Sequence, residues 1–593
     1  AQASAESEAM HKLLLCLVSA VAGRAPNYRP NFVLLFVDDL GFGDTGFNGH
    51  PTVHTPNIDR LAFGGKVLTT WYSGCPVCSG SRASIMTGRH FTRSGVPGVF
   101  PPTVNVGLPL NETTLAEQLK KAHYATAAVG KWHLGQRRPY LPGNRGFDYY
   151  LGIPYSDDMG EARATSCNCS SSTCEATAAR KGRGWSSWLR DAYGDAGYLL
   201  PHDRHAPAAV DPAGFFLPLV YQEGGKTEVL EQPLDFTHLA EKYNAFAVAF
   251  IRKHKDEPFF LYVPFSHVHT AYNSKDGAYQ YAGCKFRGRS SLGPFGDALA
   301  ETDWVVGNIH KALQDAGIEE NTLILFTGDN GPWMQQGNNA GSTGILKGQA
   351  AGYWNVGKGS TWEGGIRSAS FAYWKGQIQA GSTSSQVVSS LDVFPTLSKL
   401  AGVPMPTDRV FDGHDMSEVL FQSQGKSQHE FLFFYGGCRP DRDGGPAAVR
   451  HGQWKAHFCT GPGLGGCEVG GKECEKVEYD DFPLLFDVVA DPGESKPLNE
   501  KGRAPTDSQA AAAMDRILEA HKKELATFKY GTEPPEDFDR GEKPWRMSVC
   551  CSRHKLCFCP ASKRAADEKW FPAPSAMTAS GSVLAAGTAS ELV

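Results

Sequence analysis

The chain has 593 residues, of which 41% are hydrophobic and 20% are charged, and its formal net charge at pH 7 is -5. This length exceeds one ordinary core and predicts one large domain with a smaller second one. The charge balance is typical of a soluble globular protein and offers no basic surface, so we expect no nucleic-acid partner.

Residues 1–25 are interpreted as an N-terminal extension and a secretory signal peptide. A basic stretch after Met10 leads into the apolar run LLLCLVSAVAG, which ends in small residues. This run is too short to span a bilayer, and no other segment is apolar enough for a membrane helix. The sequence therefore predicts the secretory pathway, with a lysosomal or extracellular destination and no transmembrane anchor.

Strand-length apolar runs alternate with amphipathic helical stretches over the following three hundred residues or so. This alternation predicts an α/β fold with a large mixed, mostly parallel sheet flanked by helices. Residues 159–235 are rich in Gly, Ser, Arg and Cys with little periodicity, and we interpret them as a long excursion over the active face. The expected elements are NFVLLFV (31–37), a helix from Thr114 with a capping box to Glu117, YATAAV (124–129), FFLYV (259–263), a helix from about Thr302 that stops at Gly317, and TLILF (322–326).

After a further expected helix within 390–406, the pattern changes to shorter pieces. HEFLFFY, HGQWKAHFC and PLLFDVV, with a late helix near 509–528, predict a smaller C-terminal α+β domain with an antiparallel sheet. We place the main domain at 28–430 and the small domain at 431–560. The segment 561–593 is rich in Ala and Ser and is expected to be a disordered tail.

Fifteen cysteines are typical of an oxidising compartment. The tight groups within 167–174 and 550–559 predict disulfides that staple loops, with a structural zinc site as the alternative for the second group. In a secreted chain, the sequons at Asn111 and Asn168 are candidate glycosylation sites.

Polar side chains follow each of the four central apolar runs. The ligands of an open α/β sheet bind beyond the carboxyl ends of its strands, so we expect these side chains at one edge. Each alone also has a structural explanation as a turn cap or a satisfied polar group, but their coincidence at one edge favours a functional site. They are Asp38 and Asp39, Lys131 and His133 in GKWHLG, His267 and His269 in SHVHT, and Asp329 and Asn330 in TGDNGP.

The residue types at this edge indicate a hard cation beside an oxyanion. Three carboxylates and a carboxamide suit calcium, with magnesium as the alternative, better than zinc. Arg82, Lys131 and Lys358 are available to hold a tetrahedral anion beside such a cation. The combination favours phosphoryl or sulfuryl transfer.

Residues 75–90 read CPVCSGSRASIMTGRH. We expect a helix from about Arg82 to Thr87, with the small residues 79–81 as its cap and Gly88 at its end. Cys78 would then lie at the positive end of the helix, where an anion or a nucleophile of low pKa is favoured. The alternatives are a metal clip and a disulfide between Cys75 and Cys78, and spacing alone favours the disulfide.

The same stretch resembles the signature of type I sulfatases. Cys78-Ser-Gly-Ser-Arg82 with the later Met86-Thr87-Gly88-Arg89 is similar to C-x-P-S-R with a downstream L/M-T-G-R, in which the cysteine is oxidised to formylglycine. The further family landmarks VDDLGFGD, GKWHLG, GIPYSDDMG, SHVHT, FTGDNGP, GKGSTWEGGIR and PLLFDVVADPGE follow in order. They cover roughly residues 30–500 and look most like the arylsulfatase A and G group.

This resemblance implies an alkaline-phosphatase-like sulfatase fold and hydrolysis of sulfate esters to inorganic sulfate and an alcohol or phenol. It implies that Arg82 stabilises the aldehyde hydrate, that His133 assists it and that His269 protonates the leaving oxygen. The implied metal ligands are Asp38, Asp39, Cys78, Asp329 and Asn330; the implied catalytic residues are Cys78, Arg82, Lys131, His133, His269 and Lys358; Ser156, Lys131, His269 and Lys358 would bind substrate.

The implied partners are a sulfated small molecule, glycan or glycolipid, and the formylglycine-generating enzyme during synthesis. The resemblance also allows a homo-oligomer. Two positions depart from the family pattern: Gly80 replaces the motif proline, and Arg367-Ser368-Ala369 stands where R-x-P is usual. Glycine removes the bias toward an extended backbone that proline gives the preceding residue.

Gly80 therefore keeps an alternative open, a catalytically weak or inactive relative that binds sulfated glycans or lipids. A third interpretation is a metal-dependent phosphodiesterase or phosphonate hydrolase of the same superfamily, although such enzymes more often carry a Ser or Thr nucleophile.

Overall fold

The computed structural model describes residues 29–531 except 103, 163, 166–175, 178–215, 274–276, 349–355, 440–443, 465–475 and 480. The predicted signal peptide, both cysteine groups, the sequon at Asn168 and the expected tail lie outside the described residues. Within the described ranges, no helix combines the length and the apolar character needed to cross a membrane.

A ten-stranded sheet forms the main body, in the order β16-β2-β15-β13-β1-β10-β4-β5-β8-β9. Its central strands from β13 to β5 are parallel, whereas β15 and the β8–β9 hairpin pair antiparallel with their neighbours. The predicted α/β fold with a mixed, mostly parallel sheet is confirmed. In sheet order the bounds are Ser382–Ser384, Lys66–Leu68, Phe371–Tyr373, Thr322–Gly328, Asn31–Val37, Phe259–Pro264, Ala125–Lys131, Tyr149–Ile153, Leu219–Glu223 and Lys226–Glu231.

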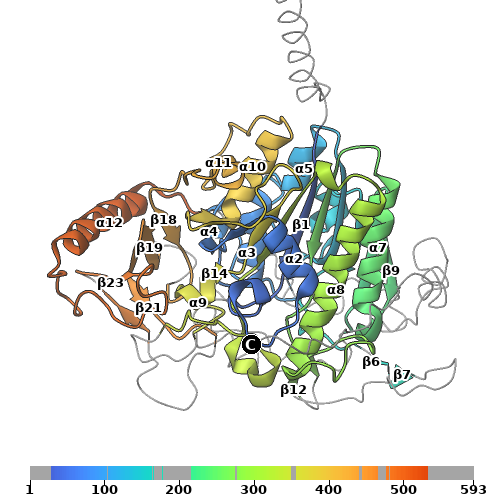
Figure 1. Cartoon of the computed structure of the whole chain (residues 1–593), viewed down its shortest axis with the longest axis horizontal. Helices are drawn as coiled ribbons and strands as arrows, with labels where there is room; N and C mark the ends of the chain where they lie inside the picture. The colour runs from blue at the N-terminus through green and yellow to red at the C-terminus, as the bar shows by residue number, and fades with distance from the viewer. Residues whose placement is uncertain are drawn as a thin grey trace, which may run out of the picture.

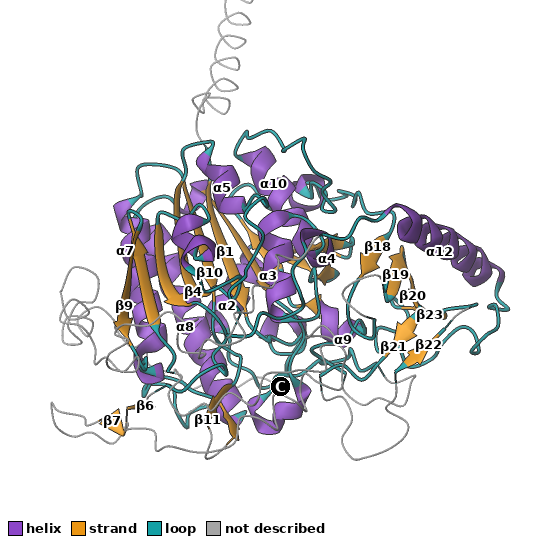
Figure 2. Cartoon of the chain, turned by 180° about the vertical axis from the view of Figure 1, so that it is seen from behind, coloured by secondary structure: helices purple, strands orange, loops and turns teal. Residues whose placement is uncertain are grey.

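Helices cover both faces of this sheet (Figures 1 and 2). α8 packs against α7 and α2, whereas α3 packs against α4, α5 and α10. The four central strands are fully buried, which explains their unbroken apolar sequences. The α-helices of the described residues are α2 (Pro56–Gly64), α3 (Cys78–Thr87), α4 (Phe91–Ser94), α5 (Leu115–Lys120), α7 (Leu239–Lys253), α8 (Gly293–Asp315), α9 (Glu363–Ile366), α10 (Val393–Leu400), α11 (Ser417–Phe421) and α12 (Ser508–Thr527).

A second, four-stranded antiparallel sheet lies beside the main body, as the orange and red part of Figure 1 shows. It consists of β18 (Leu432–Phe434), β19 (Ala448–His451), β20 (Trp454–His457) and β23 (Leu484–Asp487), and α12 packs on β19 and β20. The predicted antiparallel sheet and late helix are thus confirmed. The remaining short strands are β3 (Trp71–Tyr72), β6 (Ala164–Thr165), β7 (Ala176–Thr177), β11 (Ala271–Asn273), β12 (Gly277–Tyr279), β14 (Arg367–Ser368), β17 (Val388–Ser389), β21 (Cys459–Thr460) and β22 (Val477–Glu478).

Three predicted elements differ from the structure. The helix expected from about Thr302 begins at Gly293, because Pro294 suits a first helical turn and the buried Phe295 and Leu299 extend its apolar stripe. The helix expected within 390–406 is shorter and follows a 3₁₀ turn at Ser390–Asp392. The segment 159–235 is not all an excursion, since its end forms the β8–β9 hairpin at the edge of the sheet.

Candidate active site

The carboxyl ends of the four neighbouring strands β13, β1, β10 and β4 bring the predicted side chains to one edge. The backbones there are joined: Asp38 N donates to the His267 carbonyl at 3.1 Å, and Asp329 N donates to the Val37 carbonyl at 3.0 Å. The N–H of Asp39, in a left-handed turn with φ of 55°, donates to Asp329 Oδ1 at 3.0 Å. The expected convergence of these strand ends is therefore confirmed.

Arg82, on α3, links three of these strand ends. Its Nη2 lies 3.0 Å from both Asp38 Oδ2 and Asp329 Oδ2, and its Nη1 donates to the Lys131 carbonyl at 2.8 Å. All of these side chains are fully buried. A planar guanidinium suits this forked arrangement, because it has several fixed N–H donors.

Two lysines each pair with one of the carboxylates of Asp38 and Asp39. Lys131 Nζ is 2.5 Å from Asp38 Oδ2 and donates to Ser156 Oγ at 2.9 Å. Lys358 Nζ is 2.7 Å from Asp39 Oδ1 and lies over the Trp333 ring. Both ammonium groups are buried, and their acidic neighbours raise the pKa of each although burial itself lowers it.

The three predicted histidines have different partners. His269 bonds through Nδ1 to the Thr270 carbonyl at 2.7 Å, which leaves Nε2 3.5 Å from Asp39 Oδ2. His133 Nε2 is 3.0 Å from the Phe100 carbonyl, and its buried Nδ1 has no hydrogen-bond partner. Burial and the nearby lysines lower the pKa of both rings well below the usual value. His267 instead pairs with Glu301 of α8 at 3.0 Å and has a structural role.

The donor set fits a hard divalent cation. One ligand atom from each of Asp38, Asp39, Cys78 and His269 lies within 4.8 Å of the others. Asn330 donates through Nδ2 to Asp39 Oδ1 at 2.7 Å, while its buried Oδ1 has no partner. Calcium and magnesium prefer oxygen ligands, and an amide oxygen without a hydrogen-bond partner next to carboxylates is of this type.

The pKa values of the carboxylates also favour a cation at this site. Burial raises the pKa of Asp39, and burial with the charge of Asp38 raises the pKa of Asp329 to about 7. Burial also opposes ionisation of Asp38, but Lys131 and Arg82 hold its pKa well below the usual range. A cation in contact with these oxygens would favour their ionised forms.

Cys78 is the first residue of α3, which begins four residues earlier than predicted, so residues 79–81 lie inside the helix instead of capping it. Its Sγ lies 3.8 Å from Asp38 Oδ1. Burial raises the pKa of this thiol to about 12, so the expectation of a low-pKa nucleophile at the helix end is wrong for the thiol itself. Cys75 and Cys78 form no disulfide with each other, so the disulfide alternative is also wrong here.

The structure accommodates Gly80 within α3. Its N–H donates to the Gly98 carbonyl at 3.0 Å, a bond that proline could not make. A Cβ at this position would lie 2.5 Å from Cys75 Sγ and 3.0 Å from the Phe91 ring. The glycine therefore makes room for the side chain of Cys75.

The C-terminal region holds the loop that carries Lys358. Leu464 N donates to the Lys358 carbonyl at 2.7 Å, and Gly359 N donates to the Pro76 carbonyl, next to the Cys78 helix, at 2.8 Å. Five residues after Lys358, the buried Glu363 accepts hydrogen bonds from Tyr72 at 2.8 Å and from Lys455 of β20 at 2.7 Å. Two contacts thus join the C-terminal region to the loop that carries Lys358, one through Leu464 and one through Lys455.

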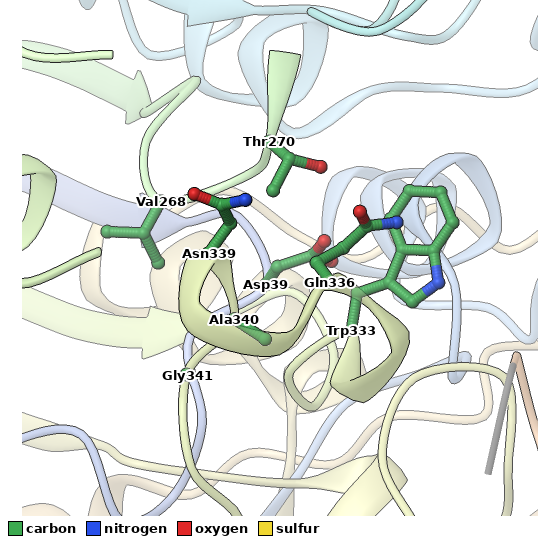
Figure 3. A pocket seen from close by; sticks show the side chains of 8 residues that line it. All are labelled: Asp39, Val268, Thr270, Trp333, Gln336, Asn339, Ala340 and Gly341. Atoms are coloured by element: carbon green, nitrogen blue, oxygen red, sulfur yellow. The ribbon is translucent and has the colours of Figure 1, made fainter. Parts of the chain in front are cut away.

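Some residues near the site were not predicted. Asp157 and Asp158 follow Ser156, and each is buried with one oxygen that has no partner. The acid pair in YSDDMG was a signal for them. Thr270, Trp333 and Gln336 gather near Asp39 (Figure 3), and no periodic pattern of the sequence predicts them. Among the sequons, Asn111 is exposed, as a glycosylation acceptor must be.

The chain belongs to the sulfatase family. The sulfatase family model matches residues 30–403, and the model for the C-terminal region of aryl-sulfatase matches residues 427–559. The chain is therefore a sulfuric ester hydrolase.

Among its relatives, it is 37% identical to human (Homo sapiens) arylsulfatase A over 93% of this chain and 99% of that protein. It is 36% identical to arylsulfatase G of Canis lupus familiaris over 91% of this chain and 93% of that protein. Among solved structures, it resembles the PsFucS1 sulfatase from Pseudoalteromonas sp. with a TM-score of 0.63 and 28% identity, over 88% of this chain and 94% of that one.

Proposed function

We propose that the chain hydrolyses sulfate esters as an arylsulfatase, through a formylglycine made from Cys78 and with calcium bound by its carboxylates. The observation that carries this proposal is the position of Cys78 within a buried cluster of acids, lysines and Arg82. A thiol with a pKa of about 12 is a poor nucleophile at physiological pH. Conversion of Cys78 to an aldehyde would replace this poor nucleophile with a group whose hydrate can attack sulfur.

Asp38, Asp39, Asp329 and Asn330 would hold the cation, with the modified side chain of residue 78 beside it. The unpartnered Oδ1 of Asn330 supports this assignment, as does the raised pKa of Asp329. A bound calcium ion would offset negative charge that develops on the transferred sulfuryl group. Magnesium is the alternative that the same oxygen ligands allow.

A hydrated formylglycine would supply one hydroxyl to attack sulfur and a second whose deprotonation expels sulfate. Arg82 would fix the carboxylates around this group, and Lys131 and Lys358 would turn from Asp38 and Asp39 to the sulfate oxygens. Ser156 accepts a hydrogen bond from Lys131 and would keep that ammonium group within reach of the sulfate. Fixed cations of this kind stabilise the transition state more than they would in water.

The two site histidines would move protons. His269 shares its Nδ1 proton with the Thr270 carbonyl, so Nε2 is the atom that would donate a proton to the leaving oxygen. The negative charge of a bound sulfate would favour the protonated ring, against the effect of the lysines. His133, whose Nδ1 is buried without a partner, would accept a proton from the hydrate.

Several further expectations belong to this proposal. Passage through the secretory pathway to a lysosomal or extracellular site, contact with the formylglycine-generating enzyme and glycosylation at Asn111 agree with an exposed sequon and a disulfide between Cys438 and Cys459. The division into a sulfatase catalytic domain at 28–430 and a small domain at 431–560 stays a prediction. The inactive alternative needs a Cys78 that is never converted.

The test is hydrolysis of an aryl sulfate by full-length protein secreted from cells that contain the modifying enzyme. We expect release of sulfate, loss of activity after prolonged chelation, and recovery with added calcium. Magnesium added at the same concentration distinguishes the two cations. Full activity in excess chelator, with no tightly held metal by elemental analysis, would overturn the ligand assignment.

A further inference from the structure

The loop after β5 runs beside Lys131, which ends the neighbouring strand β4. The two strands are parallel, with Lys131 opposite Ile153. Beyond that pair, His133 N donates to the Pro154 carbonyl at 3.2 Å, so the loop continues along the segment that holds the lysine. The loop then carries three buried polar residues in succession: Ser156, Asp157 and Asp158. The pairing of the strands therefore brings this loop to the lysine that is proposed to bind sulfate.

The hydroxyl of Ser156 connects Lys131 with Asp158. Lys131 Nζ donates to Ser156 Oγ at 2.9 Å, which occupies a lone pair of the hydroxyl oxygen. The O–H of Ser156 donates to the Asp158 carboxylate, within a turn in which Met159 N donates to the Ser156 carbonyl at 3.0 Å. A hydroxyl has one proton to donate, so the bond to Asp158 fixes the direction of its lone pairs. They point at the ammonium group of Lys131.

Asp158 is a buried acid that the protein satisfies incompletely. It is 2% exposed, and its Oδ1 has no hydrogen-bond partner among the described residues. No ion pair joins it to Lys131 in the described part of the chain, where Lys131 pairs directly with Asp38. Burial raises the pKa of Asp158, whereas the charge of Lys131 and the bond from Ser156 favour its ionised form. Such an acid indicates a role other than stability.

Asp157 is buried next to Asp158 but has a different partner. Its Oδ2 accepts a hydrogen bond from the Tyr281 hydroxyl, and the Tyr281 ring stacks on Phe236 with 4.0 Å between the ring centroids. Burial raises the pKa of Asp157 to about 8, so its carboxyl is largely neutral below that pH. Asp157 thus anchors the loop on the side of Tyr281, whereas Asp158 bonds to the hydroxyl that holds Lys131.

The bond to Ser156 limits how far Lys131 moves when it turns from Asp38 to a sulfate oxygen. An ammonium group has three N–H donors, so Lys131 can hold Ser156 with one and sulfate with another. Without Asp158, the hydroxyl of Ser156 would be free to rotate and to donate its proton to the sulfate instead. Lys131 would then lose a fixed acceptor, and a donor that has to reorganise stabilises developing charge less well.

We propose that Asp158 is a positioning residue that orients Lys131 toward the sulfate group through the hydroxyl of Ser156. The proposal rests on the proposed sulfatase function and adds a residue to the same site. Because it concerns how the sulfate group is held, it predicts a similar effect on every sulfate ester and a matching effect on the affinity for inorganic sulfate.

The experiment measures two quantities with the full-length protein in the presence of calcium. They are kcat/KM for 4-methylumbelliferyl sulfate and the dissociation constant of inorganic sulfate by titration calorimetry. Asp158→Leu removes the acceptor of the Ser156 proton, so we expect it to lower kcat/KM and the sulfate affinity by about tenfold each. Asp158→Asn keeps an acceptor oxygen and should recover most of both losses.

The control for the loss of a buried acid is Asp157→Asn, which keeps an oxygen for the Tyr281 hydroxyl. We expect it to leave both quantities unchanged, because Asp157 does not bond to Ser156 and its carboxyl is largely neutral. An effect as large as that of Asp158→Leu would mean that any acid near Lys131 has this role, and would overturn the proposal.

A double-mutant cycle with Ser156→Ala separates positioning from a structural role. If Asp158 acts through the hydroxyl, Asp158→Leu should cause no further loss in the Ser156→Ala protein. Equal losses in the two backgrounds would overturn the proposal. A thermal unfolding scan checks that each variant is folded, and Asp158→Ala completes the same cycle if Asp158→Leu is not.

The same measurements separate this proposal from the proposed function. Sulfate binding that depends on Asp158, without turnover of the aryl sulfate, would overturn the hydrolysis but support the positioning role. Turnover and sulfate affinity that are both unchanged in Asp158→Leu would overturn the positioning role alone. A wild-type protein that neither hydrolyses the ester nor binds inorganic sulfate would overturn both.

Discussion

Two buried charge clusters, one that contains Lys358 and one that contains Glu363, differ in how fully their groups are satisfied. In the cluster at the small sheet, Glu363 accepts bonds from Tyr72, Lys455 and Arg367, and Lys455 also lies 3.4 Å from Glu494. Burial raises the pKa of Glu363, but these cations outweigh it and lower the value to about 2.

In the cluster at the strand ends, the carboxylates are less well satisfied. The pKa of Asp329 is raised to about 7 by burial and by Asp38, and Asn330 and His133 each keep a buried atom without a partner. The acidic residues of both clusters are buried. The carboxylate of Glu363 is thus satisfied within the protein, although Nδ1 of His457 beside Glu494 also lacks a partner, whereas the unsatisfied groups of the second cluster are those that the proposed cation and substrate would use.

The largest expected effect comes from the residue at the centre of the incomplete cluster. Cys78→Ala removes the proposed nucleophile, so we expect aryl sulfate hydrolysis to fall by at least about a thousandfold. Thermal unfolding should change little, because the thiol has no structural bond other than the long contact to Asp38. Appreciable turnover by this variant would show that another group attacks sulfur.

Lys358→Ala removes one of the two proposed sulfate-binding cations. We expect kcat/KM to fall by about a hundredfold on every sulfate ester alike, because the sulfate group is common to all. The matched control is Lys426→Ala, since Lys426 is exposed. Unchanged kinetics for Lys358→Ala would place this lysine outside the sulfate pocket and remove the contrast between the clusters.

Glu363→Gln tests the complete cluster through stability. Breaking a buried charge network leaves Lys455 without its main partner, so we expect a loss of about 3–5 kcal/mol in the free energy of unfolding. The exposed Glu500→Gln, which only breaks a surface pair with Arg503, should change it little.

The difference in the free energy of unfolding between the wild-type protein and Glu363→Gln should decrease as the pH falls. Because the pKa of Glu363 falls from 4.5 to about 2 on folding, its stabilising effect is complete above pH 4.5 and is lost as the pH falls toward 2. Urea unfolding of the wild-type protein and of Glu363→Gln between pH 7 and pH 3 measures this difference. A gap that stays constant or widens as the pH falls would contradict the account.

The smallest effect concerns the close fit of Gly80 against Cys75. Gly80→Ala would place a Cβ 2.5 Å from Cys75 Sγ, so we expect a loss of about 1–3 kcal/mol from overpacking. Cys75→Gly should relieve part of that loss in the double variant. If the two substitutions were additive in a double-mutant cycle, the glycine would not be matched to this cysteine.

Much of the fold and site could be predicted because the signals are local. Strand-length apolar runs gave the four central strands, and the parallel arrangement places the residues after them at one edge, so Asp38, Lys131, His269 and Asp329 could be grouped from sequence. The start of the Cys78 helix could not, because Val77 gives no capping signal and residues 79–81 have low helix propensity.

The remaining features depend on contacts between distant segments. The bond from Leu464 to the Lys358 carbonyl joins residues more than a hundred positions apart, and no sequence pattern marks it. The pKa of Cys78 could not be predicted either. The helix end favours a thiolate, but burial dominates, and burial is a property of the packed structure.

Mass spectrometry of the peptide that contains Cys78, from protein secreted by cells that have the modifying enzyme, tests the central claim most directly. The account predicts that the thiol has been replaced by an aldehyde or its hydrate, so that Gly80 is tolerated in the modification motif. An unmodified thiol, or a disulfide to Cys75, would contradict it and favour a relative that binds sulfated molecules without hydrolysing them.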